Sequence, residues 1–230
     1  EEYVLHTEGD RIILITNNEA PNRKVVETTL QNPSTPGWND LIPETENVLE
    51  ASTGGGYIFA NYLVDAKTSI KKYDLNGNPL SEVKLPGIGS VNGFGGKMDE
   101  DVLYYTFTSF TYPPTIFKYD IVSGESELYE KPDIDFNPEN YETRQIFYTS
   151  KDGTEVPMFI VHKKGIELNG KNPTYLYSYG GFNISLQPRF STSRILWLEN
   201  GGIYAQPNIR GGGEYGEDWH KAGTKMQKQN

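Results

Sequence analysis

The strongest constraint on the fold is an internal repeat in the first half of the sequence. Runs rich in aromatic and β-branched residues begin at residues 11, 57 and 102, and each is followed by a second such run, at residues 23, 70 and 116. The runs therefore recur every 45–47 residues. Both sets alternate apolar and polar residues between turns of Asn, Gly and Pro, which is typical of paired β-strands. A strand pair that recurs at this interval matches the period of one blade of a β-propeller.

Further strands are expected between these runs, for example at residues 88–94, so that each unit would hold four strands. The alternative is a β-sandwich, whose strands also recur regularly but without repetition of a whole unit. We favour the propeller because the repeat includes both strands of each pair. Aromatic residues make up 13% of the chain, with 16 Tyr, which is far above the content of disordered sequences and fits a β-rich globular protein.

The pattern changes near residue 132. Pro132, followed by a polar stretch over residues 133–141 that contains Pro138, is typical of a linker. After it we expect a hairpin with its turn at residues 150–153, a short buried strand at 173–177, a helix at 191–199, a strand at 203–205 and a second helix from about Asp218. Strands that alternate with helices indicate an α/β domain. The predicted fold is therefore mixed, with propeller blades over residues 1–134 and the start of an α/β domain over residues 135–230.

The charge balance argues against two classes of partner. Asp and Glu number 31 against 21 Lys and Arg, which gives a formal net charge of −10. Nucleic acids and anionic membrane surfaces are bound by clustered cations, so we expect neither as a partner. The chain has no Cys, which excludes disulfides, thiolate metal ligands and a Cys nucleophile but leaves the compartment open between cytoplasm and periplasm.

Complete motifs for common chemistries are missing from the sequence. The glycines at residues 211–216 are not followed by the Lys-Ser or Lys-Thr of a phosphate loop, and Glu214 would repel a pyrophosphate there. His6, His162 and His220 lack the spacing of metal ligands, so we expect no metal and no cofactor. We interpret His162 and His220 as structural residues. The nucleophile elbow G-x-S-x-G does not occur.

One short motif has catalytic potential. Tyr179 precedes Gly180 and Gly181, directly after the strand predicted at residues 173–177. In α/β hydrolases the loop after the third strand supplies part of the oxyanion hole. A tyrosine hydroxyl could donate a hydrogen bond there, while the glycines allow the backbone and substrate to approach closely. Because Gly-Gly is also common in ordinary turns, the motif alone leaves both interpretations open.

The wider sequence resembles a known family. YGGFNIS at residues 179–185 and NIRGGGEYG at residues 208–216, together with QIFYTSKDGTEVPMFIVHKKG and TFTSFTYPPTIFKYD upstream, closely resemble the prolyl oligopeptidase family of serine peptidases. The resemblance implies the last blades of a seven-bladed propeller followed by the first part of an α/β-hydrolase domain. It also implies that Tyr179 is the oxyanion-hole tyrosine and that Phe182 lines a proline-binding pocket. The expected substrates are short peptides, cleaved on the carboxyl side of proline.

The same resemblance implies that the catalytic Ser, Asp and His are absent from these 230 residues. The sequence begins and ends in polar segments, and its N-terminus has neither an initiator Met nor a signal peptide. We therefore expect a segment of a longer polypeptide. The isolated chain should be inactive and should need the remainder of the same peptidase chain as its partner. The alternative is a non-catalytic, propeller-type interaction module. Three blades cannot close a propeller, however, and an open end leaves unpaired strand edges.

Overall fold

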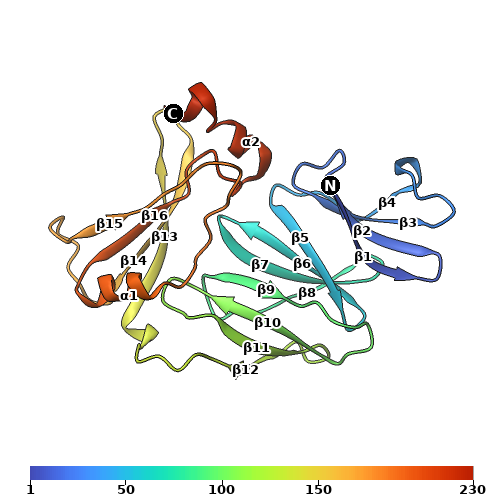
Figure 1. Cartoon of the computed structure of the whole chain (residues 1–230), viewed down its shortest axis with the longest axis horizontal. Helices are drawn as coiled ribbons and strands as arrows, with labels where there is room; N and C mark the ends of the chain where they lie inside the picture. Colours follow the sequence, from blue (N-terminus) through green and yellow to red (C-terminus); the bar gives the residue numbers. More distant parts are fainter. Residues whose placement is uncertain (230) are drawn as a thin grey trace.

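Three similar β-sheets make up the first part of the computed structural model, which describes residues 1–229. Each is an antiparallel meander of four strands in chain order. The sheets fan out one after another from the N-terminus (Figure 1). Their strands are β1 (Glu2–Glu8), β2 (Arg11–Thr16), β3 (Lys24–Thr29) and β4 (Asn39–Ile42); β5 (Val48–Gly54), β6 (Tyr57–Val64), β7 (Lys67–Asp74) and β8 (Pro79–Glu82); β9 (Ser90–Gly93), β10 (Val102–Thr108), β11 (Thr115–Asp120) and β12 (Ser126–Glu130).

The hydrophobic cores of this part lie between neighbouring sheets. Between the second and third sheets, Phe94 stacks on Phe59 and on Tyr105 with ring centroids 4.9 and 4.7 Å apart. Side chains of the first and second sheets form a separate cluster. Consecutive meanders, each packed on the next, are the blades of a propeller, so the predicted fold class is confirmed and the β-sandwich alternative is wrong.

The fourth sheet differs from the blades in both order and direction. Its order is β13 (Tyr141–Thr149), β14 (Glu155–Lys163), β16 (Ile203–Pro207) and β15 (Thr174–Leu176). β15 and β16 run parallel, and the crossover between them contains α1 (Thr192–Glu199), which packs on β14 and β16. α2 (Gly216–Lys221) follows β16. This mixed sheet is the predicted start of an α/β domain.

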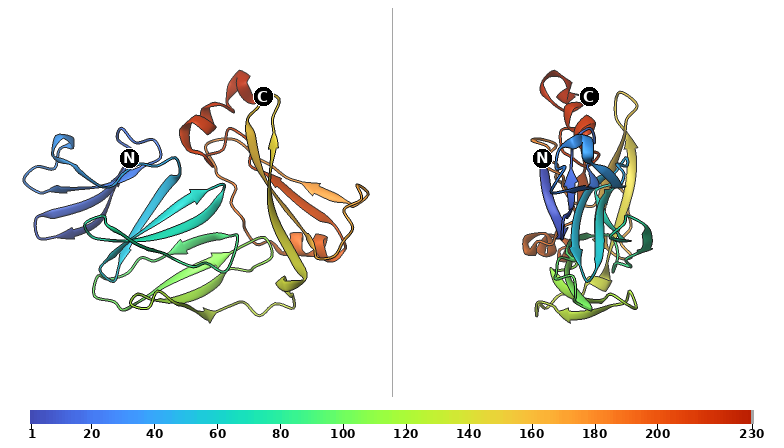
Figure 2. Two further views of the ribbon diagram at one scale, coloured as in Figure 1. Left: turned by 180° about the vertical axis from the view of Figure 1, so that it is seen from behind. Right: turned by 90° about the vertical axis from the view of Figure 1, so that its right-hand side faces the viewer.

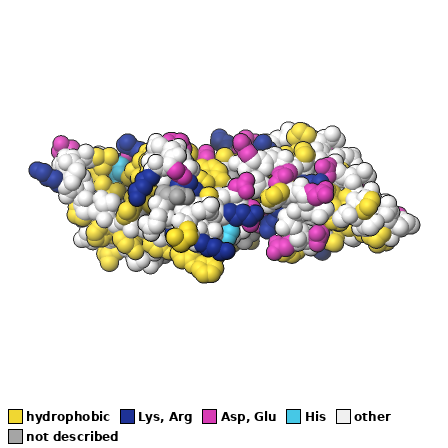
Figure 3. Space-filling view, turned by 90° about the horizontal axis from the view of Figure 1, so that it is seen from above, with side chains coloured by type: hydrophobic (Ala, Val, Ile, Leu, Met, Phe, Trp, Pro, Cys, Tyr) yellow, Lys and Arg dark blue, Asp and Glu magenta, His cyan; other side chains and the backbone are white. Residues whose placement is uncertain are grey.

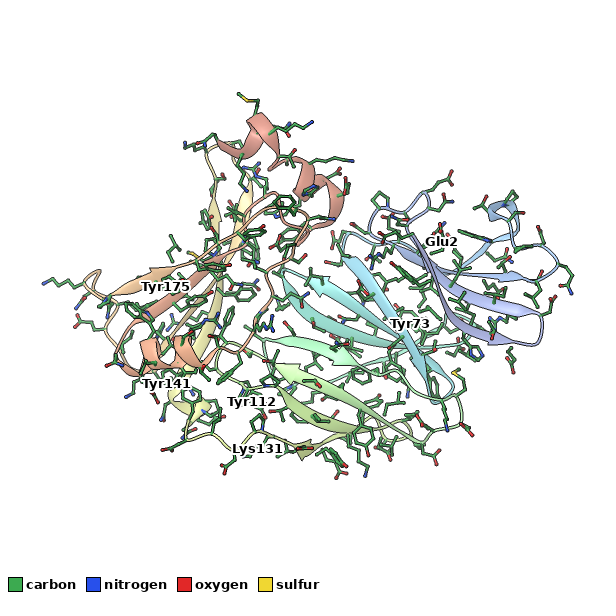
Figure 4. The ribbon with its side chains drawn as sticks, viewed as in Figure 1. Glu2, Tyr73, Tyr112, Lys131, Tyr141 and Tyr175 are labelled. Atoms are coloured by element: carbon green, nitrogen blue, oxygen red, sulfur yellow. The ribbon has the colours of Figure 1, made fainter. Side chains whose placement is uncertain are left out.

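Two expectations for this part need correction. The strand predicted as buried at residues 173–177 forms β15, but all three of its residues are exposed. The reason is that β15 is the edge strand, next to β16, and α1 packs mainly on β14 and β16. Hydrophobic side chains accordingly gather over the left half of the molecule in Figure 3, where the fourth sheet lies, and Tyr175 is labelled in that sheet in Figure 4. The second helix begins at Gly216, two residues before the predicted start.

A short linker joins the blades to the fourth sheet. It runs from the end of β12 to the start of β13 and contains η2 (Pro138–Asn140), where the Asn137 side chain accepts a hydrogen bond from the amide of Glu139 at 3.0 Å. The third blade also reaches into the other core, because Phe110 is fully buried there beside Phe159 and Tyr204. Figure 2 shows the result from two sides, with the fourth sheet standing beside the fan of blades.

Candidate active site

The loop that follows β15 carries both residues singled out in the sequence. In this Tyr179 loop (residues 177–185), the Tyr179 side chain is 43% exposed and the Phe182 side chain is 85% exposed. Gly180, Phe182 and Asn183 have φ angles of +60°, +53° and +58°. A left-handed backbone is easy for Gly but costs about 1–3 kcal/mol at other residues, which contacts with the surrounding structure must offset. The loop therefore needs support from the rest of the structure.

The main support is the Gly-rich loop (residues 208–216), which lies directly behind the Tyr179 loop. A side chain added at Gly211 would place its Cβ 2.2 Å from the carbonyl oxygen of Gly180, and one at Gly213 would lie 2.7 Å from that of Asn183. The amide of Asn183 also donates to the carbonyl of Gly211 at 3.2 Å. Backbone therefore packs on backbone, and these glycines are required for close contact with the Tyr179 loop.

Two basic side chains from the end of the chain contact these loops. His220, which we interpret as structural from the sequence, donates from Nδ1 to the Gly211 carbonyl at 2.8 Å. Lys228, in η3 (Lys225–Gln229), donates from Nζ to the carbonyl of Gly180 and, at 2.9 Å, to that of Arg210. The helix predicted from about Asp218 ends at Lys221, and the separate 3₁₀ segment η3 follows it.

Arg210 fixes the Gly-rich loop to the β13–β14 hairpin. Its side chain is only 9% exposed and donates to both carboxylate oxygens of Asp152, and also to Thr154 Oγ1 at 3.0 Å and Ser150 Oγ at 3.2 Å. The hydrogen bonds from this guanidinium lower the pKa of Asp152 well below its usual range. Such a bidentate pair holds a defined geometry, so the Gly-rich loop has a firm anchor.

A buried carboxyl group supports the far end of the Tyr179 loop. Glu214 is 1% exposed, and its Oε1 accepts hydrogen bonds from the amide of Leu186 at 2.9 Å and from Asn208 Nδ2 at 3.1 Å. Within residues 1–229, its Oε2 has no hydrogen-bond partner. Burial raises the pKa of Glu214 above the usual range of a glutamate.

The second and third blades contact the part of the chain that contains the fourth sheet and the two loops. Tyr215 donates its hydroxyl proton to Asp65 Oδ1 at 2.7 Å, and the Gln145 side chain donates to the Asp65 carbonyl at 2.5 Å. Ser90 donates to the carbonyl of Pro188 at 2.8 Å. A cavity of about 450 Å³ lies at this boundary, lined by Ser90 and Thr108 of the third blade and by the chain from Ile184 to Arg189, but neither Tyr179 nor Phe182 lines it.

Sequence reasoning identified Tyr179 and Phe182 but not the residues that hold their loop. Arg210, Glu214 and Lys228 gave no functional signal of their own, although the first two lie inside the NIRGGGEYG motif. In the described residues, no group of three His, Asp or Glu side chains could hold a metal ion. None of the helices formed by residues 1–229 is long and apolar enough to cross a membrane.

Comparison with known proteins identifies the family. Residues 1–132 match the family described as "Prolyl oligopeptidase, N-terminal beta-propeller domain", and residues 188–230 match the "Prolyl oligopeptidase family". The chain is 59% identical over 227 residues to a prolyl endopeptidase from Elizabethkingia meningoseptica and 36% identical over 242 residues to one from Dictyostelium discoideum. Each match covers 99% of this chain but 32% of the relative, so the chain spans about a third of their length.

Solved structures give the same result. One, from a study of two prolyl endopeptidases and the role of inter-domain dynamics in their catalysis and specificity, superimposes with a TM-score of 0.90 at 43% identity and covers 99% of this chain and 34% of that chain. Prolyl oligopeptidase B from Galerina marginata, bound to a 35mer hydrolysis and macrocyclization substrate, has a TM-score of 0.88 at 30% identity and covers 99% of this chain and 33% of its own. The chain therefore belongs to the prolyl oligopeptidase family of serine peptidases.

Proposed function

We propose that this chain is part of a serine endopeptidase that cleaves short peptides on the carboxyl side of proline. Residues 1–134 would be the last blades of its propeller, and residues 135–230 the start of its α/β-hydrolase domain. Relatives named prolyl endopeptidase that match 99% of the chain support this assignment over a non-catalytic interaction module. The peptide bound to the related Galerina enzyme supports a peptide substrate.

In the proposed reaction, a serine from the rest of the polypeptide attacks the carbonyl carbon of the prolyl residue. A histidine takes the serine proton and later gives it to the leaving amine, and an aspartate orients that histidine. The carbonyl oxygen gains negative charge as the tetrahedral intermediate forms. Tyr179 would donate its hydroxyl proton in a hydrogen bond to this oxyanion, and the Phe182 ring would pack against the proline ring.

The observation that carries the proposal is that the exposed Tyr179 loop is held in place through its backbone. The backbone of the Tyr179 loop is held by the Gly-rich loop, while the Tyr179 and Phe182 side chains stay accessible. Preorganised donors stabilise developing charge because they need no rearrangement during the reaction. An exposed aromatic ring on a left-handed backbone position is unfavourable for folding and is therefore consistent with a binding role.

The test is hydrolysis of a succinyl-Gly-Pro chromogenic peptide and its Gly-Ala analogue by the full-length peptidase that contains this sequence. We expect kcat/KM to favour the prolyl peptide, and Phe182→Ala to lower that value by about 10- to 200-fold, the range for losing part of an apolar pocket. Leu196→Ala, which removes another exposed apolar side chain, from α1, serves as the matched control. Equal hydrolysis of both peptides, or a Phe182→Ala enzyme with unchanged preference, would overturn the assignment. Residues 1–230 alone should show no turnover.

A further inference from the structure

The backbone next to Tyr179 is held at one particular atom, the carbonyl oxygen of Gly180. Gly211 lies against this oxygen so closely that only a glycine fits there. The Lys228 ammonium group donates to the same oxygen from a segment 48 residues further along the chain. Through its second hydrogen bond, to the Arg210 carbonyl at 2.9 Å, Lys228 also holds the Gly-rich loop. A single ammonium group thus joins the two loops.

Lysine is well suited to this position. Its compact ammonium carries three donors, so it can satisfy two carbonyls that approach from different loops. Hydrogen bonds from an ionised donor are roughly twice as strong as those between neutral groups. One of the two acceptors is itself firmly placed, because the Arg210 side chain is anchored on Asp152. Lys228 therefore connects the Tyr179 loop to the β13–β14 hairpin through Arg210.

The Tyr179 loop has a specific need for such a connection. Phe182 and Asn183 both hold left-handed backbone angles, which relax unless neighbouring contacts prevent it. The amide of Asn183 is held by the Gly211 carbonyl. Nearer to Tyr179, the Gly180 carbonyl receives its hydrogen bond from Lys228. Loss of that bond would free the part of the loop that carries the Tyr179 side chain.

We propose that Lys228 is a positioning residue, whose ammonium group holds the Tyr179 loop on the Gly-rich loop and so sets the location of the Tyr179 hydroxyl. This inference rests on the proposed role of Tyr179 in the oxyanion hole. Lys228 would contact neither substrate nor nucleophile and would act only through the Gly180 carbonyl. Its contribution should therefore appear in kcat and should depend on the presence of the Tyr179 hydroxyl.

The experiment uses the full-length peptidase and a succinyl-Gly-Pro amide substrate whose acylation limits the rate. Lys228→Met removes the ammonium but keeps most of the side chain, whereas Lys228→Arg keeps cationic donors. We expect Lys228→Met to lower kcat roughly 10- to 100-fold, the size of effect that a misplaced catalytic group produces, with KM changed less than about twofold. Lys228→Arg should recover much of this loss. Lys221→Met is the control, because it removes the same charge from an exposed site, where Lys221 forms an ion pair with Glu217 one helical turn away.

A double-mutant cycle with Tyr179→Phe separates positioning from a general structural role. In the Tyr179→Phe enzyme, Lys228→Met should change kcat by less than about twofold, because the group that it positions is gone. Multiplicative losses, or an equal kcat loss in Lys221→Met, would overturn the proposal. If Lys228→Met does not fold, Lys228→Gln and Lys228→Arg are compared, and identical wild-type kcat values in both would overturn it as well. A Tyr179→Phe enzyme with wild-type kcat would instead refute the proposed oxyanion role.

Discussion

Replacing Phe110 with Ala removes the largest side chain that the third blade inserts into the core of the fourth sheet. Phe110 is fully buried, and its ring centroid lies 5.3 Å from that of Phe159 and 5.7 Å from that of Tyr204. The Arg194 guanidinium lies 5.2 Å from the same centroid. Phe110 therefore contacts β14, β16 and α1 at once, although it belongs to the β10–β11 connection.

The expected loss follows from this burial. A buried Phe→Ala change costs about 3–5 kcal/mol, the sum of lost transfer free energy and the cavity that remains. A free-energy loss of that size lowers the protection of the affected amides against hydrogen exchange roughly 10²- to 10⁴-fold. Because Phe110 belongs to the third blade but packs in the core of the fourth sheet, the loss of protection should include β14 (Glu155–Lys163) and β16 (Ile203–Pro207) as well as β10.

The assay is hydrogen exchange followed by mass spectrometry on the full-length peptidase. Tyr104→Ala is a matched control, because Tyr104 lies on β10 of the same blade, is 45% exposed and contacts Tyr129 on the outer surface. That change should cost about 0.5–1.5 kcal/mol for the lost aromatic pair and leave β14 and β16 protected. If Phe110→Ala increases exchange in the third blade only, the reasoning that this ring joins the two domains is refuted.

Two further predictions concern groups with raised pKa values. Burial raises the pKa of Glu214, so the folded state binds the carboxyl proton more tightly than the unfolded state does. The free energy of unfolding should therefore be greatest below the ordinary pKa of a glutamate. It should decline as the pH rises through the raised pKa of the folded state. Glu214→Gln should reduce this decline, and the urea midpoints measured at about pH 5 and about pH 8 should then differ less than in the wild type. An unchanged difference would show that Glu214 does not cause the decline. Tyr215→Phe removes the hydrogen bond to Asp65 and should cost about 1.5–3 kcal/mol, the range for a hydrogen bond to a charged group. The exposed Tyr129→Phe should cost almost nothing, and equal effects of the two changes would mean that the bond to Asp65 contributes no stability.

The blades were predictable because their determinants are local. Alternation along each strand selects the face that is buried, and β11 (Thr115–Asp120) shows strict alternation of buried and partly exposed residues. Turn residues then set the hairpins: Gly55 and Gly56 adopt positive φ between β5 and β6. Each blade pairs strands that are consecutive in the sequence, so repetition of the pattern is enough to predict repetition of the fold.

The support of the candidate site was not predictable, because it depends on contacts between distant segments. The sequence shows that Gly211 belongs to a turn. It does not show that a side chain at this position would collide with Gly180, which precedes it by about thirty residues. Lys228 lies in a polar segment that alone predicts only a solvated surface. The exposure of β15 depended on which strand becomes the edge of the fourth sheet, which the hydrophobicity of residues 173–177 does not encode. Tyr179 and Phe182 stood out through the resemblance of their motif to a family.

The most direct test of the account is the kcat of Tyr179→Phe in the full-length peptidase, measured with a prolyl amide substrate whose acylation limits the rate. The change removes one hydroxyl group from a side chain that is 43% exposed, so the unfolding midpoint should stay the same. Loss of one oxyanion donor should lower kcat by roughly 10²–10³-fold, with a much smaller change in KM, because the negative charge develops only in the transition state. A Tyr179→Phe enzyme with wild-type kcat and a lowered unfolding midpoint would contradict the account, since Tyr179 would then serve only to pack its loop.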